Sequence, residues 1–320
     1  RVVSLVPSIT EALAGARPES LVGATDWCTH PADLDVTRVR GTKNPDLKAI
    51  RALSPDLVVA NKEENRELDV RRLRDAGVPV WVTDIETVPQ AIASLERLFD
   101  EALQWPRPDW LADARRLWCG PPPPVTRTVV IPIWRDPWMV VGSSTFTGDL
   151  ARRLGLANAY ANHADRYPSI DVAELDAAGA DVVLLPDEPY LFTKDDGPEA
   201  FTSTPTELVS GRLLTWYGPS LVEAHRTLVV LGQAGYHAHD RDIVAFPDHA
   251  GEVGRGHLAA DRPLDDAADL LQVLAVVARL LREQRRVGRD AVDDADGGQR
   301  LDVLDVAGVD EEFHERSFGK

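Results

Sequence analysis

The sequence predicts an α/β fold with two Rossmann-like lobes, each built on a parallel sheet, and a ligand cleft between the lobes. Two observations lead to this prediction. Short apolar segments alternate with helical patterns through most of the chain, which is typical of a parallel sheet covered by helices on both faces. One helix–strand unit also occurs twice in the same register, which indicates two similar lobes.

The N-terminal α/β lobe is predicted over residues 1–86. Ser8 and Glu11 offer a helix cap and an early acidic residue directly after the first apolar segment. Asp46 offers a second cap before another helical pattern. The expected strands are residues 2–7, 21–24, 57–60 and 78–83, and the expected helices are residues 8–16, 46–53 and 67–76.

Residues 87–120 are predicted to link the two lobes. Their pattern is helical to Trp118, with a break at Trp105-Pro106-Arg107-Pro108, and four prolines at 121–124 stiffen the exit. The C-terminal α/β lobe follows over residues 121–236, where the strand–helix alternation resumes. Its expected strands are residues 128–133, 139–141 and 182–185, and its expected helices are residues 147–154 and 171–177.

The internal repeat aligns residues 46–63 with residues 171–188 without a gap. Each copy begins a helix at Asp, makes a small turn, and continues through a second Asp into an apolar strand and an acidic loop. Two unrelated helix–strand units can also look alike, which is the alternative explanation. Two similar lobes remain the favoured interpretation.

Residues 237–320 differ from the rest, because all eight Trp and all five Tyr precede His237. This acidic tail is rich in Asp and Arg, and one amphipathic helix is predicted over residues 265–286. The tail has few ways to form its own core. Packing on a lobe, pairing with a partner and disorder all stay open.

Composition excludes several classes of partner. The net charge of −17 argues against a nucleic-acid or anionic-membrane surface, since both need clustered Lys and Arg. Cys28 and Cys119 match no metal-binding spacing and are expected to be free thiols. No signal peptide is visible at Arg1, and the apolar stretch 270–281 is too short to cross a bilayer. We therefore expect a soluble protein.

Aromatic residues gather in the loops that follow the predicted strands. Ligands of parallel α/β sheets bind at the carboxyl ends of the strands, and one Trp or Tyr there covers roughly 150–250 Å². The alternative is that each ring packs into its own lobe. The candidate ligand-binding residues in these loops are Asp26, Trp27, Trp134, Arg135, Trp138, Tyr167, Glu188, Tyr190, Trp216 and Tyr217.

At several of these residues the chain resembles a known family. Residues 3–11, 54–58, 134–139, 184–190 and 216–219 resemble the cobalamin- and iron-chelate-binding proteins of ABC importers, most of all the cobalamin-binding branch. The resemblance covers about residues 1–231. It implies two lobes joined by one rigid backbone helix, here within residues 87–118, with the ligand held between the lobes.

The resemblance also implies site residues. The family surrounds its corrin with aromatic rings from both lobes, and the matching positions are Trp27, Tyr167, Trp216 and Tyr217, with Trp138 a less certain match. Two further aromatic positions of the family fall on Thr42 and Asn61, so both enter the set of candidate ligand-binding residues. The resemblance thus predicts a pocket with fewer rings on the N-terminal side.

The residues expected to dock on an importer differ from those of the family. The resemblance places one surface Glu per lobe against Arg of the importer's membrane subunits, but this chain has Lys48 and Ala173 there. Partnership with an ABC importer is therefore expected to be weakened. The family implies an extracytoplasmic location, in the periplasm or at the cell surface, whereas the missing signal peptide leaves a cytoplasmic role open.

Catalysis is not expected. The chain has no Walker loop, no HExxH motif and no GxSxG elbow. Glu63, Glu64 and Glu188 offer an acid–base group, but charged residues at loop ends are commonly solvated. His237 and His239 lack the further ligands of a structural metal site. We expect no enzyme, no metal of the protein's own and no intrinsic cofactor.

The leading hypothesis is a solute-binding component of an ABC-type uptake system that binds a bulky metal chelate, preferably a cobalamin-like corrinoid. A ferric siderophore or haem is the nearest alternative, although Arg135 is the one obvious loop cation for an anionic chelate. An intracellular protein that handles a cofactor on the same scaffold is the second alternative, since a fold does not fix a function.

Overall fold

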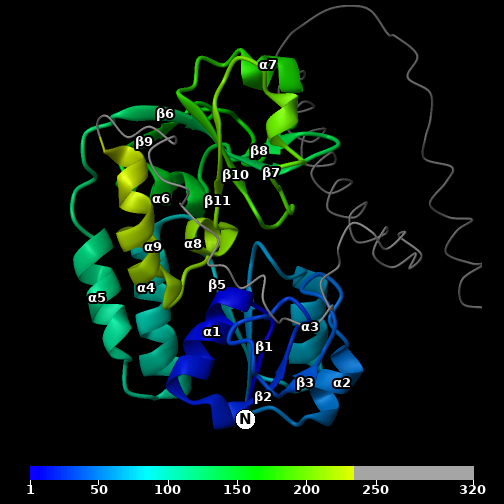
Figure 1. The fold of residues 1–320 in the computed structure, drawn as a ribbon. Helices are drawn as coiled ribbons and strands as arrows, with labels where there is room; N and C mark the ends of the chain where they lie inside the picture. Colours follow the sequence, from blue (N-terminus) through cyan, green and yellow to red (C-terminus); the bar gives the residue numbers. More distant parts are fainter. Residues whose placement is uncertain (234–320) are drawn as a thin grey trace, which may run out of the picture. The chain divides into compact units, whose positions relative to one another are not determined.

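Two parallel sheets form the framework of the protein (Figure 1). The structure, a computed structural model, describes residues 1–233, so the predicted tail over 237–320 and its helix over 265–286 lie outside the described residues. The predicted α/β class with two parallel-sheet lobes is confirmed. Among the described residues, no helix is both long and apolar enough to cross a membrane.

The N-terminal lobe contains a five-stranded parallel sheet of order β3-β2-β1-β4-β5. Its central strands are short and apolar because helices cover both of their faces. The strands are β1 (Val2–Ser4), β2 (Leu21–Ala24), β3 (Thr37–Arg38), β4 (Leu57–Asn61) and β5 (Val80–Thr83). The helices are α1 (Pro7–Ala16), η1 (Pro18–Ser20), α2 (Leu47–Ala52) and α3 (Glu67–Asp75).

The C-terminal lobe contains a four-stranded parallel sheet of order β11-β10-β6-β9 and a small antiparallel pair, β7 and β8. The strands are β6 (Arg127–Val130), β7 (Pro132–Trp134), β8 (Met139–Val140), β9 (Leu156–Asn158), β10 (Val182–Pro186) and β11 (Thr206–Val209). The helices are α6 (Phe146–Arg153), α7 (Val172–Asp176), η3 (Pro198–Ala200), α8 (Gly211–Thr215), α9 (Ser220–Leu228) and η4 (Val229–Gly232).

The linking segment is a pair of packed helices, separated at the predicted break over residues 105–108. Helix α4 (Val88–Arg97) runs on as the π-helical η2 (Leu98–Leu103), and α5 (Asp109–Trp118) begins after a break. Gln104 ends the first helix in the left-handed region, with φ 54° and ψ 41°. Pro106 and Pro108 cannot donate the next helical hydrogen bonds, so the chain turns back there. Arg115 of α5 then pairs with Glu96 of α4.

The internal repeat occupies equivalent places in the two lobes. Asp46 and Asp171 are the N-caps of α2 and α7, and each side chain accepts a hydrogen bond from a backbone N–H of the first turn. The strands that follow, β4 and β10, are each flanked by two parallel neighbours, one of which is an edge strand. The repeat therefore reflects two structurally similar lobes.

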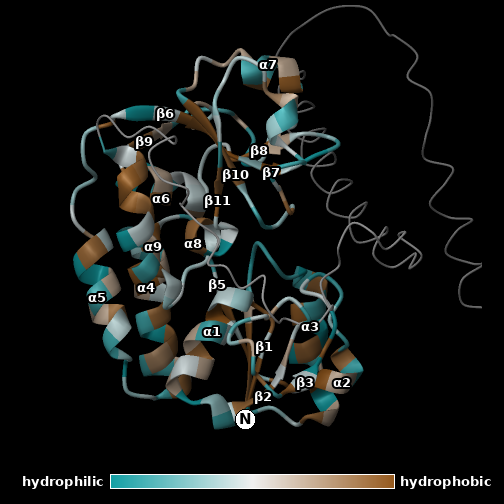
Figure 2. Cartoon of the chain, viewed as in Figure 1, coloured by the Kyte–Doolittle hydropathy of each residue, from teal (hydrophilic) through white to brown (hydrophobic). Residues whose placement is uncertain are grey.

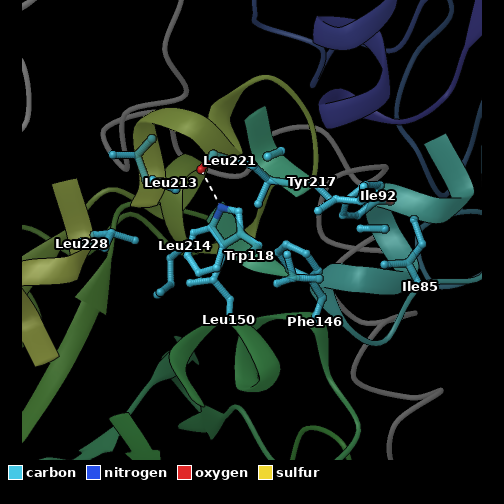
Figure 3. Close-up of a cluster of buried hydrophobic side chains, with 14 of the residues drawn as sticks. Ile85, Ile92, Trp118, Phe146, Leu150, Leu213, Leu214, Tyr217, Leu221 and Leu228 are labelled. Atoms are coloured by element: carbon cyan, nitrogen blue, oxygen red, sulfur yellow. Dashed lines mark hydrogen bonds between the residues drawn. The ribbon is translucent and has the colours of Figure 1, made fainter. Parts of the chain in front are cut away.

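One apolar core extends from the inner face of one sheet to that of the other, and two smaller clusters cover the opposite faces. Figure 2 shows hydrophobic residues along the central strands of both sheets and hydrophilic residues over many of the connecting loops. Trp118 is the largest fully buried side chain of the main core, and its Nε1 donates to the Leu221 carbonyl over 2.8 Å (Figure 3). This contact fixes the linking helix α5 against α9.

We expect Trp118→Phe to lower the free energy of unfolding by about 1–3 kcal/mol, because it removes this hydrogen bond and leaves a void in the core. Trp27→Phe is the matched control. Trp27 is 48% exposed, so its substitution should change stability by no more than about 0.5 kcal/mol. Urea unfolding followed by circular dichroism measures both. Equal losses in the two variants would contradict the assignment of Trp118 as a core anchor.

Candidate functional site

The two lobes meet along a polar seam, which we define as Glu11, Glu63, Glu64 and Glu86 of the N-terminal lobe with Arg166, Tyr167, Arg212 and Tyr217 of the C-terminal lobe. The four Glu side chains of the N-terminal lobe are the hydrogen-bond acceptors, and the Arg and Tyr side chains of the C-terminal lobe are the donors. The seam includes the carboxyl end of β4, where parallel α/β sheets bind ligands. It is therefore the candidate site.

Loop geometry after β4 brings Glu63 and Glu64 to the seam. The buried Asn61 side chain accepts hydrogen bonds from the backbone N–H groups of Glu63 (2.8 Å) and Glu64 (3.2 Å). Asn61 also donates to the Thr83 hydroxyl over 3.0 Å. Asn61, which was predicted to contact the ligand, thus holds the loop that carries Glu63 and Glu64.

Glu63 receives two donors from the opposite lobe. The Arg166 guanidinium lies 3.0 Å from its Oε2, and the Tyr167 hydroxyl donates to its Oε1. Arg166 also pairs with Glu86 over 2.9 Å. Burial, the charge of Glu63 and its hydrogen bond raise the pKa of Tyr167 well above its usual value, so the phenol stays neutral.

Glu64 is a half-buried carboxyl group of the seam. Burial raises its pKa to about 7, although a hydrogen bond from the Tyr217 hydroxyl (3.0 Å) and the charge of Lys43 act in the opposite direction. Burial also raises the pKa of Glu188 to about 7, helped by the charges of Asp187 and Glu64. Glu63, Glu64 and Glu188 are thus partly buried rather than fully solvated loop ends.

The loop after α8 closes the seam against α1. Arg212 pairs with Glu11, and the Trp216 ring meets the His30 ring edge-on at 5.2 Å. Gly218 lies against the backbone of Ser8, and a Cβ atom there would stand 2.6 Å from the Ser8 carbonyl oxygen. Only glycine permits this close approach of the two lobes.

Four predicted residues lie away from the seam, in the C-terminal lobe. Trp138 is 8% exposed and stacks on Phe192 in the lobe's core, which corrects the expectation that it faces a ligand. Trp134 meets Tyr190 edge-on at 5.5 Å. Arg135 pairs with Asp196 and Glu199 and lies over the Trp138 ring. The Tyr190 hydroxyl donates to Asp196 over 2.7 Å.

The remaining predicted residues lie in the N-terminal lobe. Asp26 and Trp27 are exposed after β2, and Trp27 precedes His30 by three residues. Thr42 is half-buried, and its carbonyl oxygen accepts a hydrogen bond from Asn65 over 2.9 Å. Tyr167, Trp216 and Tyr217 are thus the predicted rings that the structure brings to the other lobe.

Sequence reasoning missed the ionic partners of the seam. Glu11 and Arg212 are 201 positions apart, and Glu63 and Arg166 are 103 apart, so no local pattern links them. The one usable signal was the acidic pair after β4 in the internal repeat. Cys28 and Cys119 are free, as predicted. The described residues contain no group of His, Cys, Asp or Glu placed to hold a metal ion.

A shallow depression of about 480 Å³ lies elsewhere, among Arg1, Asp56, Trp81 and Trp105. It lies at the amino ends of β1, β4 and β5. Ligands of parallel sheets bind at the opposite ends. We therefore retain the seam as the candidate site.

The chain is similar in sequence to vitamin B12-binding proteins. The protein of Pectobacterium carotovorum subsp. carotovorum (strain PC1) is 32% identical over 100 residues, which are 31% of this chain and 36% of that protein. The protein of Salmonella typhi is 34% identical over 99 residues, which are 31% and 37% of the two chains. This chain thus matches little more than a third of the length of these relatives. No protein-family profile matches it.

Solved structures share the fold over most of their length. The periplasmic vitamin B12 binding protein BtuF of Vibrio cholerae matches with a TM-score of 0.58 and 16% identity, over 72% of this chain and 94% of that one. The periplasmic haem-binding protein RhuT of Roseiflexus sp. RS-1 matches with a TM-score of 0.60 and 22% identity, over 72% and 96%. The predicted resemblance to the cobalamin- and iron-chelate-binding proteins is therefore confirmed, and the chain has the two-lobed fold of these periplasmic binding proteins.

Proposed function

We propose that the protein binds a bulky metal chelate between its lobes, preferably a cobalamin-like corrinoid, as the solute-binding component of an ABC-type uptake system. One observation carries the proposal. Trp27 leaves 48% of its surface exposed at the end of β2, three residues before His30, whose ring contacts Trp216 of the other lobe. An exposed indole in the loop whose His30 meets the other lobe is suited to a broad apolar ligand face. The vitamin B12-binding relatives agree with this choice.

Charge favours a corrinoid over an anionic chelate. The two guanidinium groups of the seam are already paired, Arg166 with Glu63 and Glu86, and Arg212 with Glu11 and Glu223. Neither is left to hold the carboxylates of a haem or a siderophore. The rim of a corrinoid carries neutral amide groups, whose N–H groups suit carboxylate acceptors such as Glu63.

A haem or ferric siderophore is the second candidate within the same class. The fold is shared with a haem-binding protein, and Arg135 supplies a cation in the C-terminal lobe. Its pairing with Asp196 and Glu199 makes this candidate weaker. An intracellular protein that handles a cofactor remains the third candidate, and turnover of a bound corrinoid would favour it.

An extracytoplasmic location and an importer as partner belong to this proposal. The vitamin B12 and haem binding proteins that share the fold are described as periplasmic. The loaded protein would deliver its ligand to the membrane subunits of the importer. We propose the first turns of α2 and α7 as the docking surface, because they occupy equivalent places in the two lobes.

The ligand is tested by titrating cyanocobalamin, haemin and a ferric siderophore in parallel against the tryptophan fluorescence of the full chain. We expect quenching by cyanocobalamin at micromolar protein, because Trp27 is exposed after β2 and Trp216 contacts His30 of the other lobe. Trp27→Ala and Trp216→Ala should each weaken binding by about 1–3 kcal/mol, the range for an aromatic anchor. Trp105→Ala, in the linking segment beside the amino ends of β1, β4 and β5, is the control and should leave the affinity unchanged. No quenching by cyanocobalamin would refute the corrinoid proposal.

Docking is tested with the double variant Lys48→Glu/Ala173→Glu. Both side chains are exposed in the first turns of α2 and α7. If the importer's membrane subunits present Arg, two added carboxylates should strengthen association several-fold at low salt, since each exposed ion pair contributes up to about 1 kcal/mol. Binding to a vitamin B12 importer in nanodiscs measures this. Weaker association of the double variant than of the unmodified protein would exclude this docking surface.

A further inference from the structure

Each guanidinium group of the seam faces two carboxylates. Arg166 of the C-terminal lobe pairs with Glu63 over 3.0 Å and with Glu86 over 2.9 Å, and both glutamates belong to the N-terminal lobe. Arg212 also has two carboxylate partners. Two cations thus share four carboxylates, and these ion pairs together carry an excess of negative charge.

Arg166 is the more accessible of the two cations. Its side chain is 36% exposed, whereas that of Arg212 is 20% exposed and that of its partner Glu11 is 12% exposed. A ligand group that enters between the lobes can therefore reach the Arg166 guanidinium more readily. What such a group meets there depends on the two carboxylates that already hold this guanidinium.

The backbone keeps Arg166 at the lobe contact independently of its ionic partners. The Arg166 carbonyl accepts a hydrogen bond from the Gly142 N–H over 2.7 Å, and the Pro168 carbonyl accepts one from the N–H of Val140 in β8 over 3.1 Å. A Cβ atom at Gly142 would stand 2.3 Å from the Asp165 carbonyl oxygen, so the loop lies directly on this glycine. Neutralising the partner carboxylates would thus leave the guanidinium in place.

Glu63 and Glu86 occupy the donors that an anionic ligand would need. They accept hydrogen bonds from the two terminal nitrogens of Arg166, one each, and their charges outnumber its own. A guanidinium binds a ligand carboxylate through paired, charge-assisted hydrogen bonds, which these glutamates pre-empt. A ligand carboxylate would also approach two like charges. Neutral amide groups meet neither obstacle, since their N–H groups donate to carboxylates.

We propose that Glu63 and Glu86 determine the charge class of the ligand. By holding Arg166 they disfavour chelates whose rim carries carboxylates and favour chelates whose rim carries neutral amides. This inference rests on the proposed function, because it concerns the same site between the lobes. It assigns the selection to two glutamates rather than to the aromatic rings, which would pack on a corrin or a porphyrin alike.

Haemin, which carries propionate carboxylates, is the probe for this selection. Its affinity is measured by absorbance titration of the full chain, for the unmodified protein and for the double variant Glu63→Gln/Glu86→Gln. Each Gln keeps the length of the side chain and an acceptor oxygen for Arg166 and Tyr167, but it carries no charge. We expect haemin to bind the double variant about tenfold more tightly, because a partly exposed guanidinium is released to a ligand carboxylate.

Two control variants separate the role of Arg166 from a change in net charge. The triple variant Glu63→Gln/Glu86→Gln/Arg166→Gln has no guanidinium to release, so it should lose the gain in haemin affinity. The double variant Asp100→Asn/Glu101→Gln removes two exposed carboxylates from the linking segment, where they pair with other arginines. Because distant surface charges are screened by salt, it should change haemin affinity by less than about twofold.

Two outcomes overturn the inference. One is a haemin affinity that is the same in the double variant, shown to be folded by circular dichroism, as in the unmodified protein. The other is a gain that persists in the triple variant. Glu86→Gln alone changes one half-exposed side chain and should give a gain of about threefold, so it decides the question if the double variant does not fold.

Parallel titration with cyanocobalamin keeps this test apart from that of the proposed function. An unmodified protein that does not bind cyanocobalamin would refute the corrinoid proposal. The comparison of haemin affinities among the variants would still decide whether Glu63 and Glu86 select against carboxylates through Arg166.

Discussion

A carboxyl group enclosed between two lobes needs a hydrogen-bond donor, and this requirement connects the main contacts of the described part of the molecule. Glu64 stands where β4 ends, and Tyr217 reaches it from the loop between α8 and α9. The turn that carries Tyr217 comes close enough because Gly218 lies directly on the Ser8 carbonyl. The hydrogen bond of Trp118 stabilises this arrangement, because it fixes α5 to α9, the helix that follows this turn. Core packing and the polar seam are thus parts of one arrangement.

The contacts of the seam also affect how a ligand would bind. Side chains that would face a chelate, such as Tyr167 and Tyr217, hold the opposite lobe in this structure. A ligand must therefore replace these contacts, and its affinity depends on the difference between the two sets of interactions. A broad apolar ligand with amide groups satisfies both the rings and the carboxylates. An anionic ligand would meet carboxylates whose cations are already engaged.

Much of the fold was predictable from the sequence, because its signals are local. Asp46 and Asp171 mark helix starts, and the apolar strands after them recur at the same spacing. The site was less predictable. An aromatic residue in a loop gives no sign of which way it turns, so Trp138 was expected at a ligand although it packs on Phe192 in the core. The Glu11–Arg212 pair depends on residues far apart in the chain, which periodicity cannot reveal. The break in the linking segment was predictable, because Pro106 and Pro108 follow the cap residue Gln104.

We propose that a ligand occupies the space where the two lobes contact each other in this structure. A crystal structure of the protein grown with cyanocobalamin tests this most directly. We expect the corrin beside Trp27 and Trp216, with the contacts of Glu63 to Arg166 and Tyr167 broken. A corrin bound elsewhere, with those contacts intact, would contradict it.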